Sequence, residues 1–229
     1  GAMAYYSLMA ADAGMAGVAI VCSPPNMAPA GARVAGVHNS PLSIAVPAGA
    51  HQPLVLDMAT SVAAGGKLSL AIDKGISIPE TWALDAEGNP TTDPNEASVL
   101  QPFGGPKGSG MAMLFECLSS LMVGNPLLSA VLNGTGNVRR GMQNSVLMAI
   151  DISMFTDVDQ YKKDVDDLIE GIKTLPRADG VVEIMVPGEP EDRVYQERVA
   201  KGIPLPPGTV DSLKAAANRF EIELPRELR

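Results

Sequence analysis

Apolar and polar residues along the chain follow two spacings, and each spacing predicts one kind of element. Short, almost uninterrupted apolar runs are typical of buried strands, and they lie at 18–22, 42–47, 54–58, 145–152 and 181–186. Helices are predicted, from three- and four-residue apolar steps and from capping signals, over 4–14, 59–75, 109–122, 157–176, 187–202 and 207–220. Strands and helices alternate along much of the chain, which favours an α/β or mixed α+β domain.

A glycine-rich loop with one lysine precedes the helix predicted at 109–122. It begins the stretch QPFGGPKGSGMAMLFECLSSLMVGN, from Gln101 to Asn125. Glycines allow positive φ and the close approach of a ligand, and the unpaired N–H groups of a helix start favour an anion. Lys107 adds positive charge there, so a phosphate site and a plain turn with a solvated lysine are equally good interpretations. Neither a P-loop nor a Gly-x-Gly-x-x-Gly turn is present, so a standard dinucleotide fold is not indicated.

Two features around the predicted helix at 59–75 have two interpretations each. The pair Gly65-Gly66 lies inside this helix and costs roughly 2 kcal/mol against alanine, which indicates either close packing there or a simple kink. Asp57 ends the apolar run before Thr60 and Ser61. It is read first as the N-cap of the helix, and alternatively as part of a ligand site at the end of a strand.

Composition and charge exclude several classes of protein. The chain has 229 residues, enough for one large or two small domains, and 46% hydrophobic residues, enough for a core. Its formal net charge of −9 argues against nucleic-acid binding, which needs a basic face. No apolar run is long enough to span a membrane, and no basic segment opens a signal peptide. We therefore expect a cytoplasmic protein with no membrane or nucleic-acid partner.

Few residue types suited to catalysis occur, and none forms a recognisable set. Cys22 and Cys117 lie in apolar sequence and are read as buried thiols in a reducing compartment, without metal spacing around them. His38 and His51 lie in predicted loops, and no Gly-x-Ser-x-Gly elbow accompanies them. We therefore expect no metal site and no cysteine nucleophile, while a serine-histidine-acid triad without the usual elbow stays open.

Four motifs, taken together, are more specific. In this order the chain carries LDMATSVAAGGKL, WALDAEGNPTTDP, PFGGPKGSGMAM and VPGEPE. They resemble the malate/L-lactate dehydrogenase family of the second type, which also includes ureidoglycolate and sulfolactate dehydrogenases and the piperideine/pyrroline-2-carboxylate reductases. The resemblance covers essentially the whole chain. It implies a mixed-sheet fold with flanking helices, distinct from the Rossmann fold, and an oxidoreductase that uses NAD or NADP on small 2-oxo or cyclic 2-imino acids.

The resemblance also implies roles for particular residues. The positions that fall where the family binds its cofactor are Gly1, Ala2, Ser23, Asp57, Met58, Ala59, Lys107, Gly108, Gly188, Glu189 and Glu191. The positions that fall near the substrate are Asn39, Thr60 and Ser61. Asn39 stands where the family usually has a threonine, a difference that bears on substrate identity. Lys67 falls where some relatives carry an aspartate that assists catalysis.

The resemblance finally bears on what residues 1–229 contain. We expect them to be the cofactor- and substrate-binding bulk of the enzyme, because family members carry their candidate proton-donating histidines in a segment before the position of Gly1. Gly1-Ala2-Met3 is read either as native sequence or as the remnant of a tag. His38 is the nearest substitute for a proton donor. A homodimer is implied, and two functions stay open: an oxidoreductase, or a binding module without catalysis.

Overall fold

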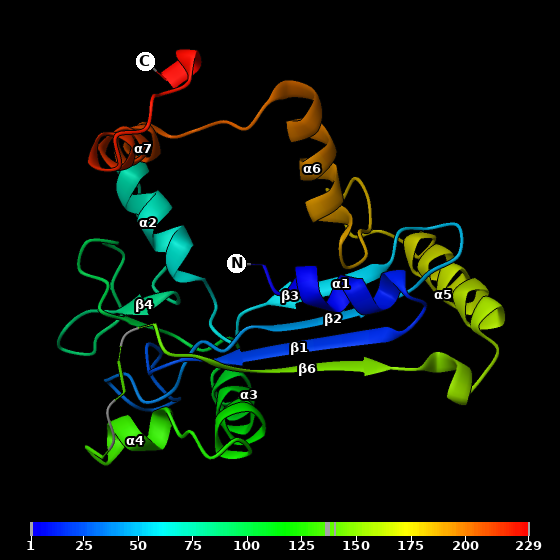
Figure 1. Ribbon diagram of the computed structural model, residues 1–229, viewed down its shortest axis with the longest axis horizontal. Helices are drawn as coiled ribbons and strands as arrows, with labels where there is room; N and C mark the ends of the chain where they lie inside the picture. The colour runs from blue at the N-terminus through cyan, green and yellow to red at the C-terminus, as the bar shows by residue number, and fades with distance from the viewer. Residues whose placement is uncertain (1, 136–137, 140, 229) are drawn as a thin grey trace.

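A four-stranded antiparallel sheet forms the centre of the molecule. The computed structural model describes residues 2–135, 138–139 and 141–228 of the chain. Within them the strand order is β3-β2-β1-β6 (Figure 1). The strands are β1 (Ala16–Cys22), β2 (Leu42–Val46), β3 (Leu54–Met58) and β6 (Asn144–Ile150). Every neighbouring pair is antiparallel, so β1 and β3 both end, and β2 and β6 both begin, at one edge of the sheet.

Helices cover both faces of this sheet, and the alternation of side chains along β1 explains why. Helix α1 (Ala4–Asp12) lies against Gly17, where an added Cβ would come within 2.1 Å of the Ser7 carbonyl oxygen. On the other face, Cys22 packs in a buried cluster with Ala112 of helix α3 (Pro106–Glu116). Helix α3 continues as a π-helix at Cys117–Leu121. The sheet is therefore held between α1 and α3 (Figure 1).

A second, smaller layer lies beside the sheet. Helix α2 (Gly65–Lys74) packs over the two-stranded sheet of β4 (Ala83–Leu84) and β5 (Val99–Leu100), with Trp82 in the same apolar cluster. The short helix α4 (Leu128–Leu132) contributes Leu128 to the cluster around Cys22.

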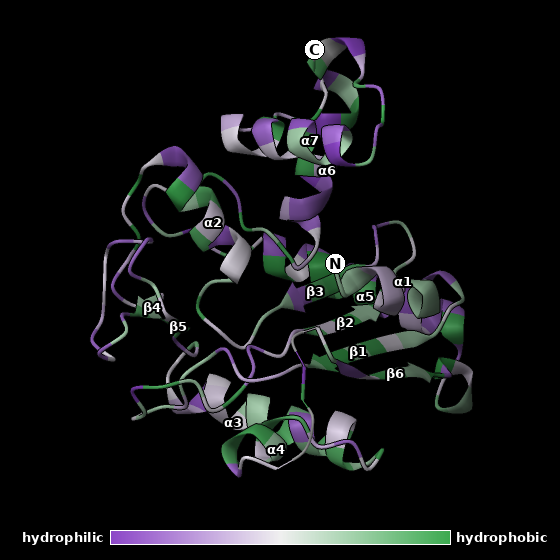
Figure 2. Cartoon of the chain, turned by 60° about the vertical axis from the view of Figure 1, so that its left-hand side comes forward, coloured by the Kyte–Doolittle hydropathy of each residue, from purple (hydrophilic) through white to green (hydrophobic). Residues whose placement is uncertain are grey.

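The C-terminal part, from residue 152 on, is largely helical and more polar than the central sheet. It contains a 3-10 turn at Ile152–Met154, α5 (Val158–Lys173), α6 (Glu189–Lys201), α7 (Pro207–Arg219) and a 3-10 turn at Arg226–Leu228. Figure 2 shows hydrophilic colour over much of α6, in contrast to the hydrophobic colour of β1. Helix α7 is tied to α2 by the Gly208 amide, which donates to Asp73 Oδ1 at 2.9 Å. No helix among the described residues is both long and apolar enough to cross a membrane.

The mixed α+β class is confirmed, and several element predictions need correction. The run at 181–186 forms no strand: a single backbone hydrogen bond, from the Val55 amide to the Pro187 carbonyl, joins its end to β3. Val186 instead packs in an apolar cluster with Val165 and Ile169 of α5. Of the face predicted on α5, Val165 and Ile169 are buried but Leu168 is exposed.

The helices around the motifs begin at other residues than predicted. Helix α2 starts at Gly65, not at 59, so the glycine pair forms its first turn, and a Cβ added at either glycine would meet no other element within 4 Å. Helix α3 starts at Pro106, because proline suits the first position of a helix, and this brings Lys107 inside the first turn. Cys117 is exposed rather than buried.

Candidate functional site

The sheet edge where β1 and β3 end is hollowed into a cavity of about 860 Å³, here called the strand-end cavity. Antiparallel pairing brings the residues after β1 and β3 and those before β2 and β6 to this edge. The start of α1 covers it with Ala2, Met3, Tyr5 and Tyr6. The other lining residues are Val21, Ser23, His38, Asn39, Pro41, Asp57, Met58, Ala59, Ala64, Gln143, Ser145 and Leu147.

Backbone hydrogen bonds join this cavity to the glycine-rich start of α3. The Thr60 amide donates to the Asn39 carbonyl at 3.1 Å, and the Phe103 amide donates to the Thr60 carbonyl at 3.0 Å. The Gly108 amide in turn donates to the Phe103 carbonyl at 3.0 Å. A Cβ at Gly108 would lie 2.3 Å from the Thr60 carbonyl oxygen, so only glycine allows this approach. Thr60 is thus fixed between the cavity wall and α3.

The side chain of Asn39 is oriented by two neighbours. Asn26 Oδ1 accepts a hydrogen bond from the Asn39 backbone amide at 2.8 Å, and Asn26 Nδ2 donates one to Asn39 Oδ1 at 3.0 Å. Asn39 Nδ2 also reaches Ser61 Oγ at 3.5 Å. The Thr60 hydroxyl, by contrast, is buried and has no hydrogen-bond partner among the described residues. A buried polar atom without a partner is rare in proteins and marks a place where a ligand or a water is expected.

A buried polar cluster lies behind the His38 side of the cavity. Burial lowers the pKa of His38 to about 4, against the pull of the Glu116 carboxylate, so the imidazole is neutral at pH 7. Its Nδ1 lies 3.4 Å from Ser40 Oγ. Burial opposes the ionisation of Glu116, but the nearby Ser120 hydroxyl, the Cys22 thiol and two backbone amides favour it and lower the pKa. Those amides, of Leu127 and Leu128, donate to Oε1 at 2.7 and 2.9 Å.

The thiol of Cys22 is inert in this cluster. Burial is the main cause that raises the pKa of Cys22 to about 12, and the nearby Glu116 carboxylate raises it further. A thiol that stays protonated at neutral pH is no nucleophile. Burial therefore makes Cys22 a poor nucleophile at neutral pH.

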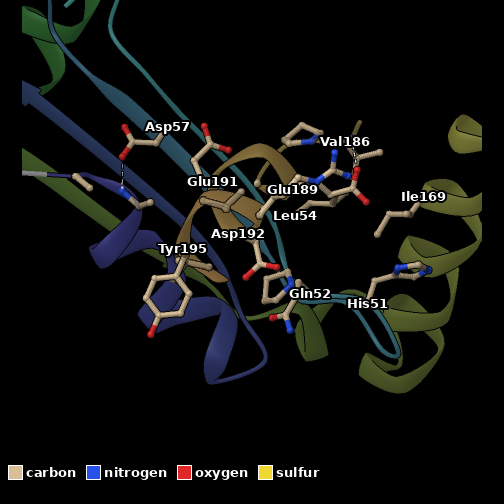
Figure 3. A pocket seen from close by; sticks show the side chains of 18 of the residues that line it. His51, Gln52, Leu54, Asp57, Ile169, Val186, Glu189, Glu191, Asp192 and Tyr195 are labelled. Carbon is tan, nitrogen blue, oxygen red and sulfur yellow. Dashed lines mark hydrogen bonds between the residues drawn. The ribbon is translucent and has the colours of Figure 1, made fainter. Parts of the chain in front are cut away.

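A second cavity, of about 770 Å³ and here called the α6 cavity, adjoins the first one and shares Ala2 and Asp57 with it. Its walls come from α1, β3, the loop at 51–53, Ile169 of α5 and the first turns of α6 (Figure 3). The polar side chains on it are those of His51, Gln52, Asp57, Glu189, Glu191, Asp192, Arg193, Tyr195 and Gln196.

Asp57 lies between the two cavities, at the end of β3. Its Oδ2 accepts the Ala4 amide at 2.8 Å, which joins the start of α1 to β3 (Figure 3). The interpretation of Asp57 as the N-cap of α2 is therefore wrong: Ala64 caps that helix, without a side-chain hydrogen bond. The alternative interpretation, a carboxylate at a ligand-binding strand end, fits its place.

The structure brings most of the predicted site residues to these two cavities. Ala2, Ser23, Asn39, Asp57, Met58 and Ala59 line the strand-end cavity, and Gly188, Glu189 and Glu191 line the α6 cavity. Thr60, Ser61, Lys107 and Gly108 line neither, although hydrogen bonds connect Thr60 and Gly108 to the wall. Lys67 also lies away, with its ammonium 5.9 Å from the centre of the Trp82 ring. Gly1 falls outside the described residues.

Sequence reasoning missed part of each lining. Gln143 and Ser145 line the strand-end cavity because Asn144 pairs with Cys22, which places the start of β6 beside the end of β1. The apolar run at 145–152 contained that signal, but only a known strand order reveals it. Arg193 and Tyr195 line the α6 cavity from a helix whose position the sequence does not specify.

The chemistry of the two linings suits an elongated polar organic ligand. No group of three or more His, Cys, Asp or Glu side chains in the described part of the chain is placed to hold a metal ion. The two adjoining cavities each fall in the usual size range of ligand pockets and combine apolar walls with a few hydroxyl, amide and carboxylate groups. A nicotinamide dinucleotide has two ribose units, and a carboxylate such as Asp57 accepts hydrogen bonds from their hydroxyl groups. These residues therefore fit such a cofactor.

Comparison with known proteins gives the family. The model of the malate/L-lactate dehydrogenase family matches residues 1–214, and the chain belongs to this family. It is 38% identical over 228 residues to the L-sulfolactate dehydrogenase of Methanothermobacter thermautotrophicus, covering 98% of this chain and 64% of that protein. It is 31% identical over 204 residues to the ureidoglycolate dehydrogenase (NAD(+)) of Escherichia coli O157:H7, covering 89% of this chain and 58% of that protein.

A solved structure agrees with this assignment. The malate dehydrogenase of Pyrococcus horikoshii OT3 superposes with a TM-score of 0.81 at 30% identity, over 97% of this chain and 63% of that one. The fold predicted from the resemblance is therefore confirmed. The chain spans somewhat less than two thirds of the length of these relatives.

Proposed function

We propose that this chain binds NAD or NADP together with a small 2-oxo or cyclic 2-imino acid, and that it serves an NAD(P)-dependent 2-hydroxyacid dehydrogenase or 2-oxoacid reductase. The gathering of predicted cofactor residues from distant parts of the sequence onto two adjoining cavities carries the proposal. The family assignment supports the reaction class, and one relative has NAD(+) in its name. Residues 1–229 would form the cofactor- and substrate-binding bulk of the enzyme.

The residues divide the work between the two cavities. When bound, the nicotinamide supplies or accepts a hydride. Ser23, Asp57 and the backbone of Met58 and Ala59 offer polar groups for the cofactor at the strand-end cavity, and Gly188 and Glu191 do so at the α6 cavity. Asn39, whose side chain Asn26 orients, offers its amide to the carboxylate or carbonyl of the substrate.

The reaction also needs a source of protons near the substrate. Reduction of a carbonyl needs a proton at its oxygen. His38 is the one histidine on the strand-end cavity, and as a neutral imidazole it is able to donate a hydrogen bond to an oxygen but is a poor source of a free proton. His38 is therefore proposed to orient the substrate rather than to be the proton donor.

A turnover assay tests the proposed reaction. The chain is incubated with NADH or NADPH and a panel of 2-oxo and cyclic 2-imino acids, and oxidation of the cofactor is followed by its absorbance. Because neutral His38 is a poor source of protons, only slow oxidation that depends on one of the acids is the expected result. Saturable cofactor binding without turnover with any acid would instead favour the second candidate, a binding module without catalysis.

The proposal includes a homodimer in the cytoplasm. Large apolar side chains are exposed together along α3 and the π-helix after it, namely Met113, Leu114, Leu118, Leu121 and Met122. Such a surface is typical of an interface between copies. The free thiols of Cys22 and Cys117 suit a reducing compartment. One chain has a mass of 23.8 kDa. Light scattering at micromolar concentration should give twice that mass, and the mass of a single chain would refute the dimer.

A further inference from the structure

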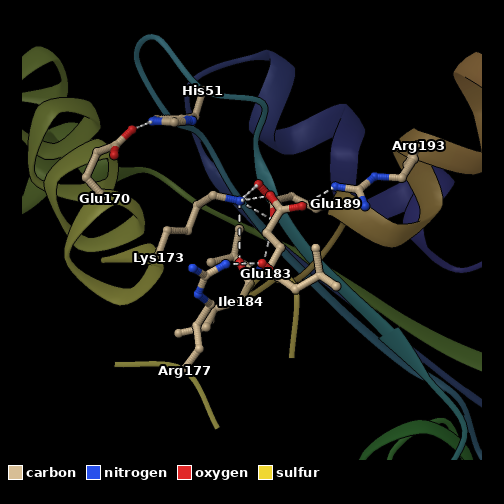
Figure 4. A network of polar contacts seen from close by, with 10 residues as sticks. His51, Glu170, Lys173, Arg177, Glu183, Ile184, Glu189 and Arg193 are labelled. Carbon is tan, nitrogen blue, oxygen red and sulfur yellow. Dashed lines mark hydrogen bonds and ion pairs between the residues drawn. The ribbon is translucent and has the colours of Figure 1, made fainter. Parts of the chain in front are cut away.

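Four charged side chains form a network behind the α6 cavity, here called the Lys173 network: Lys173, Glu183, Glu189 and Arg193. The Lys173 ammonium lies 2.6 and 2.9 Å from the two Glu189 oxygens and 2.9 Å from Glu183 Oε1 (Figure 4). Arg193 Nη2 donates to Glu183 Oε2 at 2.7 Å. The network thus joins the end of α5, the segment at 181–186 and the first turns of α6.

Lys173 is the centre of this network. It is the last residue of α5, where a positive charge is favoured by the helix dipole, and its side chain is only 22% exposed. Burial opposes the ionisation of Glu189 and the neighbouring Glu183 carboxylate repels it, but hydrogen bonds from Lys173 and the Val186 amide outweigh both and lower the pKa of Glu189. If the Lys173 ammonium were removed, Glu183 would keep its ion pair with Arg193. Glu189 would keep none of its described ion pairs.

Glu189 connects Lys173 to the wall of the α6 cavity. Its Oε2 accepts the Val186 amide at 3.0 Å, which closes the turn between the segment at 181–186 and α6. On the opposite side the turn is held by β3: the Pro187 carbonyl accepts the Val55 amide at 3.2 Å. Gly188 has φ +97°, and an added Cβ would lie 2.8 Å from Val55 Cγ1. The turn at 186–189 is therefore held between β3 and the Lys173 ammonium.

We propose that Lys173 is a positioning residue for the cofactor: it acts through Glu189 and holds the turn at 186–189 in the shape that forms one wall of the α6 cavity. The inference rests on the proposed function, because that wall is assigned to the cofactor there. Lys173 itself does not line the cavity, whereas Val186, Pro187, Gly188 and Glu189 do. It also assigns the Glu189 carboxylate to the protein scaffold, since both its oxygens are occupied by Lys173 and the Val186 amide.

The first readout needs no ligand. Lys173→Met keeps the apolar stem but removes the charge, and it should accelerate amide hydrogen exchange of a peptide covering 184–190 by about tenfold, as loss of a charge-assisted hydrogen bond does. Lys173→Arg should restore most of the protection. The matched control is Lys201→Met, which removes an exposed ion pair with Glu197 on the same helix α6 and should leave this peptide unchanged.

The second readout is cofactor binding by the same variants. Lys173→Met should raise the dissociation constant for NADH or NADPH by about tenfold, and Lys173→Arg and Lys201→Met should stay within about twofold of the wild type. Combining Lys173→Met with Glu189→Gln should weaken binding no further than the worse single change, because both changes remove the Lys173–Glu189 ion pair. Should Lys173→Met not fold, Glu189→Gln breaks the same pair and should accelerate the same peptide.

The outcomes separate this inference from the proposed function. A wild-type chain that binds neither NADH nor NADPH would refute the proposed function, while faster exchange at 184–190 would still support the positioning of the turn. Unchanged exchange in both Lys173→Met and Glu189→Gln would overturn the inference. Faster exchange with unchanged cofactor affinity, in a chain that binds the cofactor, would overturn its link to the cofactor.

Discussion

The strand-end cavity and the α6 cavity share Ala2 and Asp57, yet different forces hold their walls. Around the strand-end cavity, backbone hydrogen bonds run from Asn39 through Thr60 to Gly108, and the adjoining polar groups are buried. Around the α6 cavity, ion pairs of partly exposed side chains join the end of α5 to α6. The first wall continues the sheet, whereas the second joins β3 to α5 and α6 through one backbone hydrogen bond and these ion pairs.

The difference teaches where each cavity is vulnerable. Backbone groups that touch directly do not move aside, so added volume near Gly108 should damage the whole fold. Exposed ion pairs contribute little to stability, so changes of charge near α6 should alter binding and leave the fold intact. The strand-end cavity should therefore respond to packing and to protonation, and the α6 cavity to charge.

The largest effect is expected from Gly108→Ala. The new Cβ would meet the Thr60 and Phe103 carbonyl oxygens at 2.3 and 2.8 Å, and both are backbone atoms. The free energy of unfolding should fall by about 3 kcal/mol, as overpacking in a tight site does. Urea denaturation measures the change.

Gly110→Ala is the matched control two residues along the same helix. Apart from the backbone of its own helix, no atom lies within 4 Å of a Cβ there, so alanine should stabilise α3 by about 0.5–1 kcal/mol through its helix propensity. Equal effects of the two substitutions would contradict the close approach of α3 to Thr60.

The next effect concerns pH and His38. Burial lowers the pKa of folded His38 to about 4, below the usual value of 6.5, so the unfolded chain takes up a proton first as the pH falls. The associated stability is complete above about pH 6.5 and is lost towards pH 4. Between about pH 7.5 and pH 5 the wild type should lose about 2 kcal/mol more than His38→Asn.

His51→Asn serves as the comparison, because His51 instead pairs with Glu170 at 2.8 Å, away from this cluster. This variant should keep the loss that His38 causes. The measurement is the free energy of unfolding at both pH values. Parallel pH profiles of wild type and His38→Asn would show that the buried imidazole does not act this way.

Asp57 is the residue that sharpens the comparison, because it belongs to both cavities. Asp57→Asn still offers an oxygen to the Ala4 amide but removes the charge, so α1 should stay in place. The dissociation constant for the nicotinamide cofactor should rise by about twentyfold, through loss of charged hydrogen bonds to its hydroxyl groups. Calorimetry tests this, and an unchanged affinity would remove Asp57 from the cofactor site.

Lys107 gives the smallest effect and asks how far the site extends. Its place in the first turn of α3 keeps it a predicted contact for the cofactor pyrophosphate or ribose, although it lines neither cavity. Lys107→Ala should raise the cofactor dissociation constant by about tenfold, as loss of a charge-assisted hydrogen bond does. A constant equal to that of the wild type would confine the site to the two cavities.

Most of the fold could be predicted from the sequence, because its signals are local. The apolar runs at 18–22 and 54–58 are strands, and Gly75 ends α2 with φ +62°. The run at 181–186 misled the prediction, since its apolar residues pack against α5 instead of pairing in the sheet. Periodicity reports burial, and burial has more than one structural cause.

The site was predictable only where motifs carried it. Ser23, Asn39 and Asp57 line one cavity, because Ser23 follows β1, Asn39 precedes β2 and Asp57 lies near the end of β3, all at one edge of the sheet. The contacts of Glu189 with Lys173 were not predictable, since 16 residues separate them and no local pattern links them. The pairing of charges that are distant in the sequence depends on how α5 and α6 pack, and no local sequence pattern determines that packing.

One titration decides whether the two cavities form a cofactor site. The chain is titrated with NADH and, separately, with NADPH by calorimetry, and the same experiment is repeated with Asp57→Asn. We predict saturable binding of at least one of the two cofactors, with one molecule per chain and an affinity that falls in the variant. No saturable heat with either cofactor, or binding that Asp57→Asn leaves unchanged, would contradict the assignment of these cavities to a nicotinamide dinucleotide.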